Sequence, residues 1–144
     1  MSAFVDTSAL LALLDGDEER HTEVVAVWGE LLAAREALVT TNYVIVETFA
    51  VAQHRLGLAA AEALHSVYVP LLEVAWIEEA MHRAAALALL AARRRRVSLV
   101  DHVSFALMRE RGLSRAFSLD PHFAEQGFAL LPAPAAPSSV AEGR

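Results

Sequence analysis

Four acidic residues of the sequence stand in surroundings where a charged carboxylate is costly. Asp6 and Asp120 each follow a short apolar run typical of a β-strand, and Glu47 and Asp101 lie within mostly apolar helical segments. Burying an ionised carboxylate is unfavourable unless positive charge is close, and carboxylates that converge raise one another's pKa. Because the sequence contains no lysine, a divalent cation is the natural counter-charge. Oxygen ligands in a site open to water favour Mg²⁺ or Mn²⁺.

Each acid also has an ordinary structural explanation. Asp6 could start a helix, Asp120 could initiate a turn before a proline, and Glu47 could face solvent. Asp101 could interact with a helix dipole, which is worth about 0.3–1 kcal/mol. Two acids at strand ends together with two in apolar helices favour a common site. The remaining two aspartates lie in the glycine turn Asp15-Gly16-Asp17, where solvated acids are usual.

The composition excludes several classes of chemistry. The chain has no cysteine, so disulfides, thiolate catalysis and zinc–thiolate sites are excluded and a cytoplasmic location is expected. All twelve basic residues are arginines, which excludes Schiff-base lysines and phosphate-binding loops that need a lysine. The net charge of −6 has the wrong sign for binding nucleic acid by bulk electrostatics.

Hydrophobic residues make up 56% of the sequence, and the mean hydropathy is +0.38. The longest apolar run, Ala84–Ala92, is about half of what a membrane-spanning helix needs, so no membrane association is expected. We expect the surplus to form an apolar surface for a partner. A homodimer is the expected assembly, with the helices between Tyr43 and Tyr68 as the first candidates for its interface.

The elements that position the acids alternate between strands and helices. This alternation predicts an α/β fold with a parallel sheet covered by helices on both faces. Ligands of such sheets bind beyond the carboxyl ends of the strands, so Asp6 and Asp120 are expected to face one crevice. The predicted strands are 3–5, 37–40, 72–77, 116–119 and 128–131, and the predicted helices are 9–14, 19–35, 43–56, 59–68, 78–94 and 99–111, with a turn or short helix at 121–126.

Local signals predict helix boundaries and the core. Trp28 and Trp76 lie on apolar faces and are expected in the core, and Gly112 is expected to end the last long helix. Residues 1–131 are predicted to form one domain. The Pro- and Ala-rich segment 132–144 has no periodicity and is predicted to be disordered. The expected helix N-caps are Thr7 or Ser8, Asn42 and Ser98.

Four segments together resemble the PIN-domain nucleases, and within them the VapC-like toxins of bacterial toxin–antitoxin pairs. Phe4–Leu10 is similar to the first motif of the family, and Glu47 falls where the second acid lies. Ser98–Met108 is similar to the third motif. Ser118–Phe123, with Gly127, Phe128 and Leu131 behind it, is similar to the closing pattern, although Ser118 stands where threonine is commoner. The resemblance covers residues 3–131.

The resemblance implies a three-layer α/β/α sandwich with about five short strands. It implies a divalent metal at the acid cluster, hydrolysis of RNA phosphodiester bonds, a homodimer, and a small antitoxin protein whose tail blocks the site. On this basis Asp6, Asp101 and Asp120 are expected to bind the metal directly or through water, and Glu47 to complete the cluster. The metal would lower the pKa of a water that attacks phosphorus. One carboxylate would act as the general base.

Other polar residues near the acids allow two interpretations each. Ser8, Ser98 and Ser118 could fix carboxylate rotamers by hydrogen bonds, or could cap helices and strand ends. Arg93–Arg96 could contact RNA phosphates, or could be a solvated helix end. We interpret His122 as a structural turn residue, because metal-dependent hydrolysis needs no histidine.

Two other functions compete with a ribonuclease. A phosphatase of the haloacid-dehalogenase-like class also places an aspartate after its first strand. It would normally have a second aspartate where Ser8 stands, and a lysine that this chain lacks. A catalytically silent PIN-fold binding module is the second alternative, but an unused cluster of acids would destabilise such a module.

Overall fold

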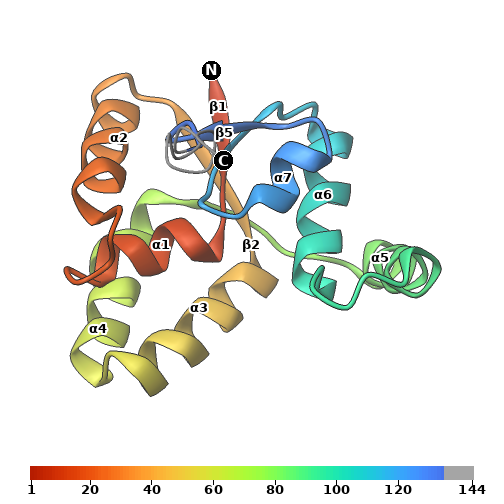
Figure 1. Ribbon diagram of the computed structural model, residues 1–144, viewed down its shortest axis with the longest axis horizontal. Coiled ribbons are helices and arrows are strands. Elements are labelled where there is room, and N and C mark those ends of the chain that lie inside the picture. Colours follow the sequence, from red (N-terminus) through yellow and green to blue (C-terminus); the bar gives the residue numbers. More distant parts are fainter. Residues whose placement is uncertain (135–144) are drawn as a thin grey trace, which may run out of the picture.

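The computed structural model describes residues 1–134 and is built around a five-stranded sheet. The strand order is β3-β2-β1-β4-β5, and every pair is parallel. The predicted parallel α/β sheet is confirmed. All strands therefore end at one edge of the sheet, and Figure 1 shows β1 leading into α1 and β2 into α3 at this edge. The strands are β1 (Ser2–Val5), β2 (Ala37–Thr41), β3 (Glu73–Ala75), β4 (Arg115–Phe117) and β5 (Ala129–Leu131).

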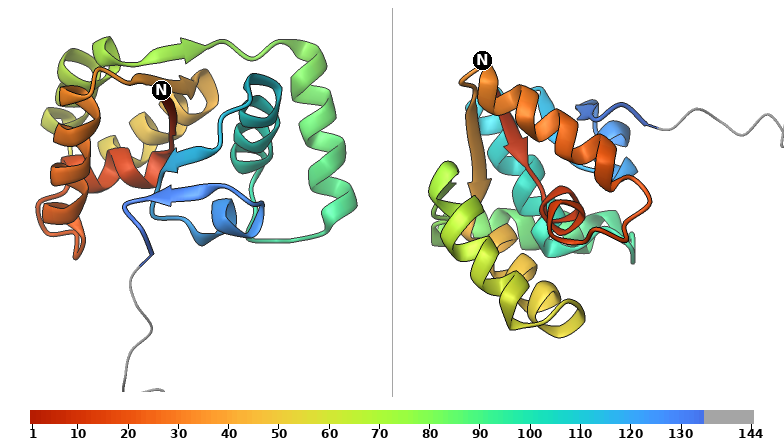
Figure 2. Two further views of the ribbon diagram at one scale, coloured as in Figure 1. Left: turned by 90° about the horizontal axis from the view of Figure 1, so that it is seen from above. Right: turned by 90° about the vertical axis from the view of Figure 1, so that its left-hand side faces the viewer.

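Helices cover the sheet on both sides. Figures 1 and 2 show α1 and α2 on one side and α5 and α6 on the other, which gives the expected three layers. Within residues 1–134, no helix is long and apolar enough to cross a membrane. The helices are α1 (Thr7–Leu14), α2 (His21–Ala33), α3 (Asn42–Arg55), α4 (Leu58–Ala63), α5 (Glu79–Ala92), α6 (Leu99–Arg111) and α7 (Pro121–Glu125).

The central strand β1 and its neighbour β4 are buried on both faces. Phe4 of β1 and Phe117 of β4 are completely buried. The ring centroids of Phe4 and Phe123 of α7 are 6.1 Å apart, and the ring of Phe117 stacks at 5.9 Å on Trp28 of α2. Large aromatic side chains thus pack the sheet against both helical layers. This packing holds the ends of β1 and β4 in position.

The start of α3 differs from the prediction. Thr41, not Asn42, is the N-cap: its hydroxyl accepts a hydrogen bond from the Val44 backbone N–H at 3.1 Å. Asn42 is already helical, and its side-chain oxygen accepts from the Ile77 N–H at 2.8 Å. This bond holds the segment that follows β3 against the beginning of α3.

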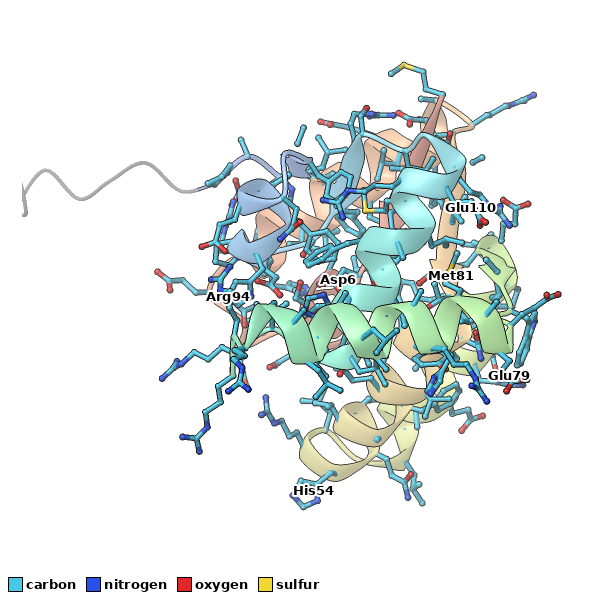
Figure 3. All side chains as sticks on the ribbon, turned by 90° about the vertical axis from the view of Figure 1, so that its right-hand side faces the viewer. Asp6, His54, Glu79, Met81, Arg94 and Glu110 are labelled. Atoms are coloured by element: carbon cyan, nitrogen blue, oxygen red, sulfur yellow. The ribbon has the colours of Figure 1, made fainter. Side chains whose placement is uncertain are left out.

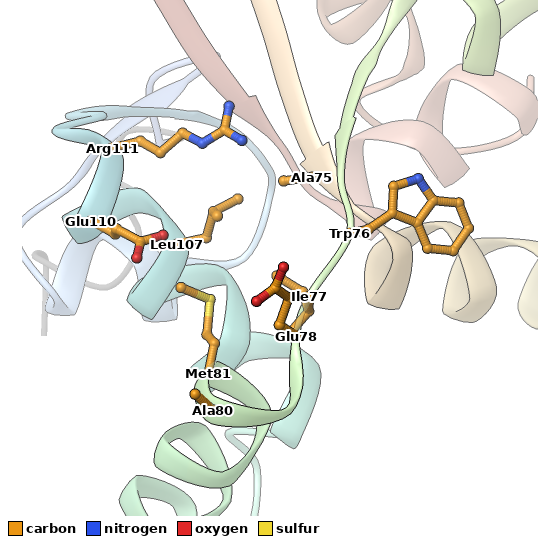
Figure 4. Close-up of a pocket in the computed structure, with 9 residues that line it drawn as sticks. All are labelled: Ala75, Trp76, Ile77, Glu78, Ala80, Met81, Leu107, Glu110 and Arg111. Atoms are coloured by element: carbon orange, nitrogen blue, oxygen red, sulfur yellow. The ribbon is translucent and has the colours of Figure 1, made fainter.

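The third strand is shorter than predicted, and Trp76 is not in the core. β3 is an edge strand that ends at Ala75, because the next segment turns away to bond with Asn42. Ala75 is buried, whereas Trp76 is 76% exposed. Figure 4 shows Trp76 projecting away from Leu107 and Arg111, on the opposite side of the chain.

The predicted helix 59–68 is divided. α4 ends at Ala63, a π-helical turn covers Leu64–Tyr68, and a 3₁₀ turn covers Val69–Leu71. Pro70 has no backbone N–H and cannot continue an α-helix.

The predicted disorder of segment 132–144 concerns mainly residues 135–144, which lie outside the described residues.

Candidate active site

Asp6 follows β1 directly and is the N-cap of α1, in place of the predicted Thr7 or Ser8. Its side chain is 3% exposed. One carboxylate oxygen, Oδ2, accepts hydrogen bonds from the hydroxyls of Ser8 at 2.8 Å and Ser118 at 2.9 Å. The rotamer of Asp6 is therefore fixed by side chains from two adjacent parts of the fold.

The two serines also bond to the backbone around Asp120. The Leu119 N–H donates to the Ser8 hydroxyl at 2.9 Å, and the Asp120 N–H donates to the Ser118 hydroxyl at 3.0 Å. The two interpretations left open for these serines are thus not exclusive. Each serine orients Asp6 and also holds the segment after β4.

Burial raises the pKa of Asp6 to about 6. The hydrogen bonds from Ser8 and Ser118 oppose this shift, and the negative charges of Asp101 and Asp120 increase it. Both burial and the two neighbouring acids therefore disfavour the charged form of Asp6.

Asp101 lies in the first turn of α6 and forms a capping box with Ser98. The Ser98 N–H donates to Asp101 Oδ2 at 2.9 Å, and the Asp101 N–H donates to the Ser98 hydroxyl at 3.1 Å. The predicted N-cap at Ser98 is confirmed, as is the end of α6 at Gly112. Burial, opposed by the Ser98 backbone bond, raises the pKa of Asp101, and Asp120 adds to this effect.

Asp120 is the N-cap of α7, and its Oδ1 accepts from the His122 backbone N–H at 2.9 Å. The His122 side chain lies beside the same carboxylate. His122 Nδ1 lies 2.9 Å from Asp120 Oδ1, yet it is buried without a partner in hydrogen-bonding geometry among the described residues. One ligand atom each of Asp101, Asp120 and His122 lies within 4.8 Å of the others.

Glu47 lies in α3 and is half-buried. Burial raises the pKa of Glu47, and the charges of Asp101 and Asp120 raise it further. The same two residues act on Asp6. Asp6 and Glu47 therefore both lie near Asp101 and Asp120. Among the described residues, the ligand atoms that lie within 4.8 Å of one another belong to Asp101, Asp120 and His122, and neither Asp6 nor Glu47 is part of that group. Figure 3 shows Asp6 in the interior, whereas a residue such as His54 projects from the surface.

The residues present fit a divalent cation. Among residues 1–134, none of the four acids forms an ion pair with an arginine. The available donors are carboxylate oxygens and the unpartnered His122 Nδ1. Such a donor set suits a hard or borderline divalent ion.

Sequence reasoning missed the placement of His122. The available signal was its position two residues after Asp120, because an aspartate N-cap bonds the backbone at that distance.

A separate hollow of about 300 Å³ lies between the end of β3 and α6. Figure 4 shows that it is lined by Glu78, Glu110 and Arg111 among others, and by none of the four acids.

Comparison with known proteins identifies the fold family. The family model of the PIN domain matches residues 3–129. The chain belongs to the PIN-domain family. It is 30% identical over 126 residues to the 23S rRNA-specific endonuclease VapC20 of Mycobacterium tuberculosis, and the match covers 87% of this chain and 94% of VapC20.

Solved structures agree with this assignment. The crystal structure of VapC20, described as a sarcin-ricin loop cleaving toxin, matches with a TM-score of 0.77 over 89% of this chain and 97% of that one. FitAcB from Neisseria gonorrhoeae has a TM-score of 0.65 at 15% identity, covering 89% and 95% of the two chains. DNA-bound VapBC from Salmonella typhimurium has a TM-score of 0.62 at 18% identity, covering 90% and 97%. At these identities the last two matches show the fold alone.

Proposed function

We propose that this PIN-domain protein is a divalent-metal-dependent endoribonuclease and the toxin of a toxin–antitoxin pair. The observation that carries the proposal is the convergence of Asp6, Glu47, Asp101 and Asp120 without a paired arginine. The 30% identity to an rRNA endonuclease over most of the chain supports RNA as the substrate. We assign the activity to a nuclease domain of residues 1–131 and to the cytoplasm, where RNA is available.

Asp6, Asp101 and Asp120 would hold Mg²⁺ or Mn²⁺, and Glu47 would complete the site. A cation held there would activate a water molecule and neutralise the charge that develops on the phosphate. Ser8 and Ser118 keep the Asp6 carboxylate in one rotamer, and Ser98 does the same for Asp101. Such fixed carboxylates reduce the reorganisation that the reaction needs.

We propose that the partners are an RNA substrate, a small antitoxin and a second copy of this chain. Val46 of α3 and Trp76 are 68% and 76% exposed. The Asn42–Ile77 hydrogen bond and a hydrogen bond between Tyr43 and His82 bring their segments together. We therefore place the proposed dimer interface on the first half of α3 and the segment after β3. This is a smaller region than the helices between Tyr43 and Tyr68 that the sequence suggested.

The family assignment removes the phosphatase alternative, because the whole domain matches the PIN fold. A catalytically silent PIN-fold module stays the competing candidate. Against this candidate, no arginine of the described residues neutralises the buried Asp6, so a silent module would carry the cost of this charge without a use for it.

The test is cleavage of bacterial ribosomal RNA by the purified chain. RNA should be cut at defined positions with Mg²⁺ or Mn²⁺, EDTA should stop the reaction, and excess metal should restore it. Primer extension on 23S rRNA, in intact ribosomes and as naked RNA, maps the cuts. Cleavage that continues unchanged in EDTA would contradict the metal mechanism, and no cleavage of any RNA would favour the silent module.

A further inference from the structure

His122 carries a ring nitrogen that the turn does not use. The Asp120 cap is completed by the His122 backbone N–H, at 2.9 Å from Oδ1. The Nδ1 atom lies equally close to the same oxygen, but it is not in hydrogen-bonding geometry with any described residue. A buried nitrogen without a partner is rare in native structures and calls for a physical explanation.

The spacing of the three side chains is that of ligands around one cation. Adjacent ligands of an octahedral ion with bonds of about 2.1 Å stand about 3.0 Å apart, and opposite ligands about 4.2 Å apart. His122 Nδ1 and Asp120 Oδ1 are separated by 2.9 Å. All three ligand atoms, including that of Asp101, lie within 4.8 Å of one another. Even a pair at this limit would need to move together by no more than about 0.6 Å to stand as opposite ligands.

We propose that His122 Nδ1 is a direct ligand of the catalytic cation, together with Asp101 and Asp120. The inference rests on the proposed function and specifies its metal. Mg²⁺ takes oxygen ligands and water, whereas imidazole nitrogen suits first-row transition ions. One imidazole among carboxylates therefore selects Mn²⁺ over Mg²⁺.

The test is pulsed electron paramagnetic resonance of the full chain loaded with Mn²⁺ alone. A directly bound imidazole gives ¹⁴N modulation of the Mn²⁺ electron spin echo, and selective ¹⁵N labelling of histidine should change its pattern. The modulation should disappear in His122→Ala and persist in His102→Ala. His102 is the matched control, because it is next to Asp101 in the chain and also has a buried ring nitrogen without a described partner.

A second readout is the selectivity of binding. His122→Ala should weaken Mn²⁺ binding at least about tenfold in calorimetric titration, with a much smaller change for Mg²⁺. Thermal unfolding in EDTA checks that the variant is folded. The ¹⁴N modulation of the wild-type protein tests the inference even if the variant does not fold. Bound Mn²⁺ without ¹⁴N modulation in the wild type would overturn the inference, as would modulation that survives His122→Ala.

The inference and the proposed function fail in different ways. Mn²⁺-dependent RNA cleavage without nitrogen coupling would overturn the role of His122 and leave the nuclease intact. Failure of the chain to bind Mn²⁺ at all would overturn both.

Discussion

Asp6 is the most constrained residue of the candidate site, because its buried carboxylate has two serine donors and no ion pair within residues 1–134. Burial raises its pKa to about 6, whereas an aspartate in an unfolded chain titrates near 3.9. Between these values the folded state binds more protons than the unfolded state. Without metal, stability therefore falls as the pH rises through this range, and above about pH 6 the full penalty is present.

Asp6→Asn should therefore stabilise the metal-free protein at pH 7.5. The gain should reach at most about 3 kcal/mol, because each pKa unit is worth about 1.4 kcal/mol, and it should shrink as the pH falls towards 4. Urea denaturation in EDTA at several pH values measures it, with Asp17→Asn in the exposed turn as the control. A gain that does not vary with pH would show that the charge of Asp6 is not its cause.

Ser118 should affect the proposed metal site beyond its contribution to stability. It is fully buried, and its hydroxyl donates to Asp6 and accepts from the Asp120 N–H. Ser118→Ala should cost about 1–3 kcal/mol of unfolding free energy, since it leaves buried groups without partners, and should also weaken Mn²⁺ binding.

Ser104→Ala is the matched control for this change. Ser104 is equally buried, but its hydroxyl bonds only the Val100 carbonyl within α6. It should lose stability and keep its Mn²⁺ affinity in the same thermal and calorimetric measurements. Equal losses of affinity in both serine variants would mean that Ser118 acts only through packing.

At the level of residues, the sequence predicted those positions that depend on neighbouring residues in the chain. Aspartates that follow apolar runs were predicted at strand ends, and the structure places Asp6 directly after β1. The predicted strand 116–119 ends at Phe117, so Asp120 lies three residues beyond β4, where it caps α7. The role of both aspartates as metal ligands stays a prediction. Trp76 was predicted wrongly, because the exposure of a residue after an edge strand depends on where the chain turns. The place of His122 beside Asp120 follows from the Asp120 cap, which bonds the backbone two residues later, but the direction of its ring depends on side-chain packing that the spacing does not give.

At the level of elements, α6 presents Asp101 through its capping box. Ser98→Ala should reduce stability by about 1 kcal/mol, because the first turn of the helix loses its side-chain acceptor. Ser98→Thr should restore most of the loss, since threonine keeps the hydroxyl. Urea denaturation of the three proteins measures this. An alanine variant as stable as the wild type would show that the box contributes nothing to α6.

The elements themselves were largely predictable, and their ends were not. Periodicity located the five strands and the long helices, and it predicted the parallel sheet that the structure confirms. The cap of α3 was wrong by one residue, because Asn42 bonds the distant Ile77 instead. The π turn at Leu64–Tyr68 was missed, since it depends on tertiary packing that buries Leu64 completely.

For the whole molecule, the exposed apolar side chains predict a dimer. A stable interface should bury at least about 1,000 Å² in total. Val46→Glu and Trp76→Glu should each give monomers in sedimentation velocity, because a charge at a buried apolar face lacks a partner. Leu58→Glu is the control: Leu58 is 73% exposed but begins α4, beyond the far end of α3. A wild-type monomer at tens of micromolar would contradict the dimer.

The central claim is that four carboxylates of this fold hold the metal that hydrolyses RNA. Its most direct test is the single-turnover rate of RNA cleavage in Mn²⁺ for Asp6→Asn, Glu47→Gln, Asp101→Asn and Asp120→Asn, with Asp17→Asn as the matched control. Each of the first four variants removes one charged oxygen of the proposed metal site and keeps the size of the side chain. Asp6→Asn and Asp101→Asn should lose about a thousandfold or more, the other two should be clearly impaired, and Asp17→Asn should cleave at the wild-type rate. Wild-type rates in Asp6→Asn and Asp101→Asn, or an equal loss in Asp17→Asn, would contradict the account.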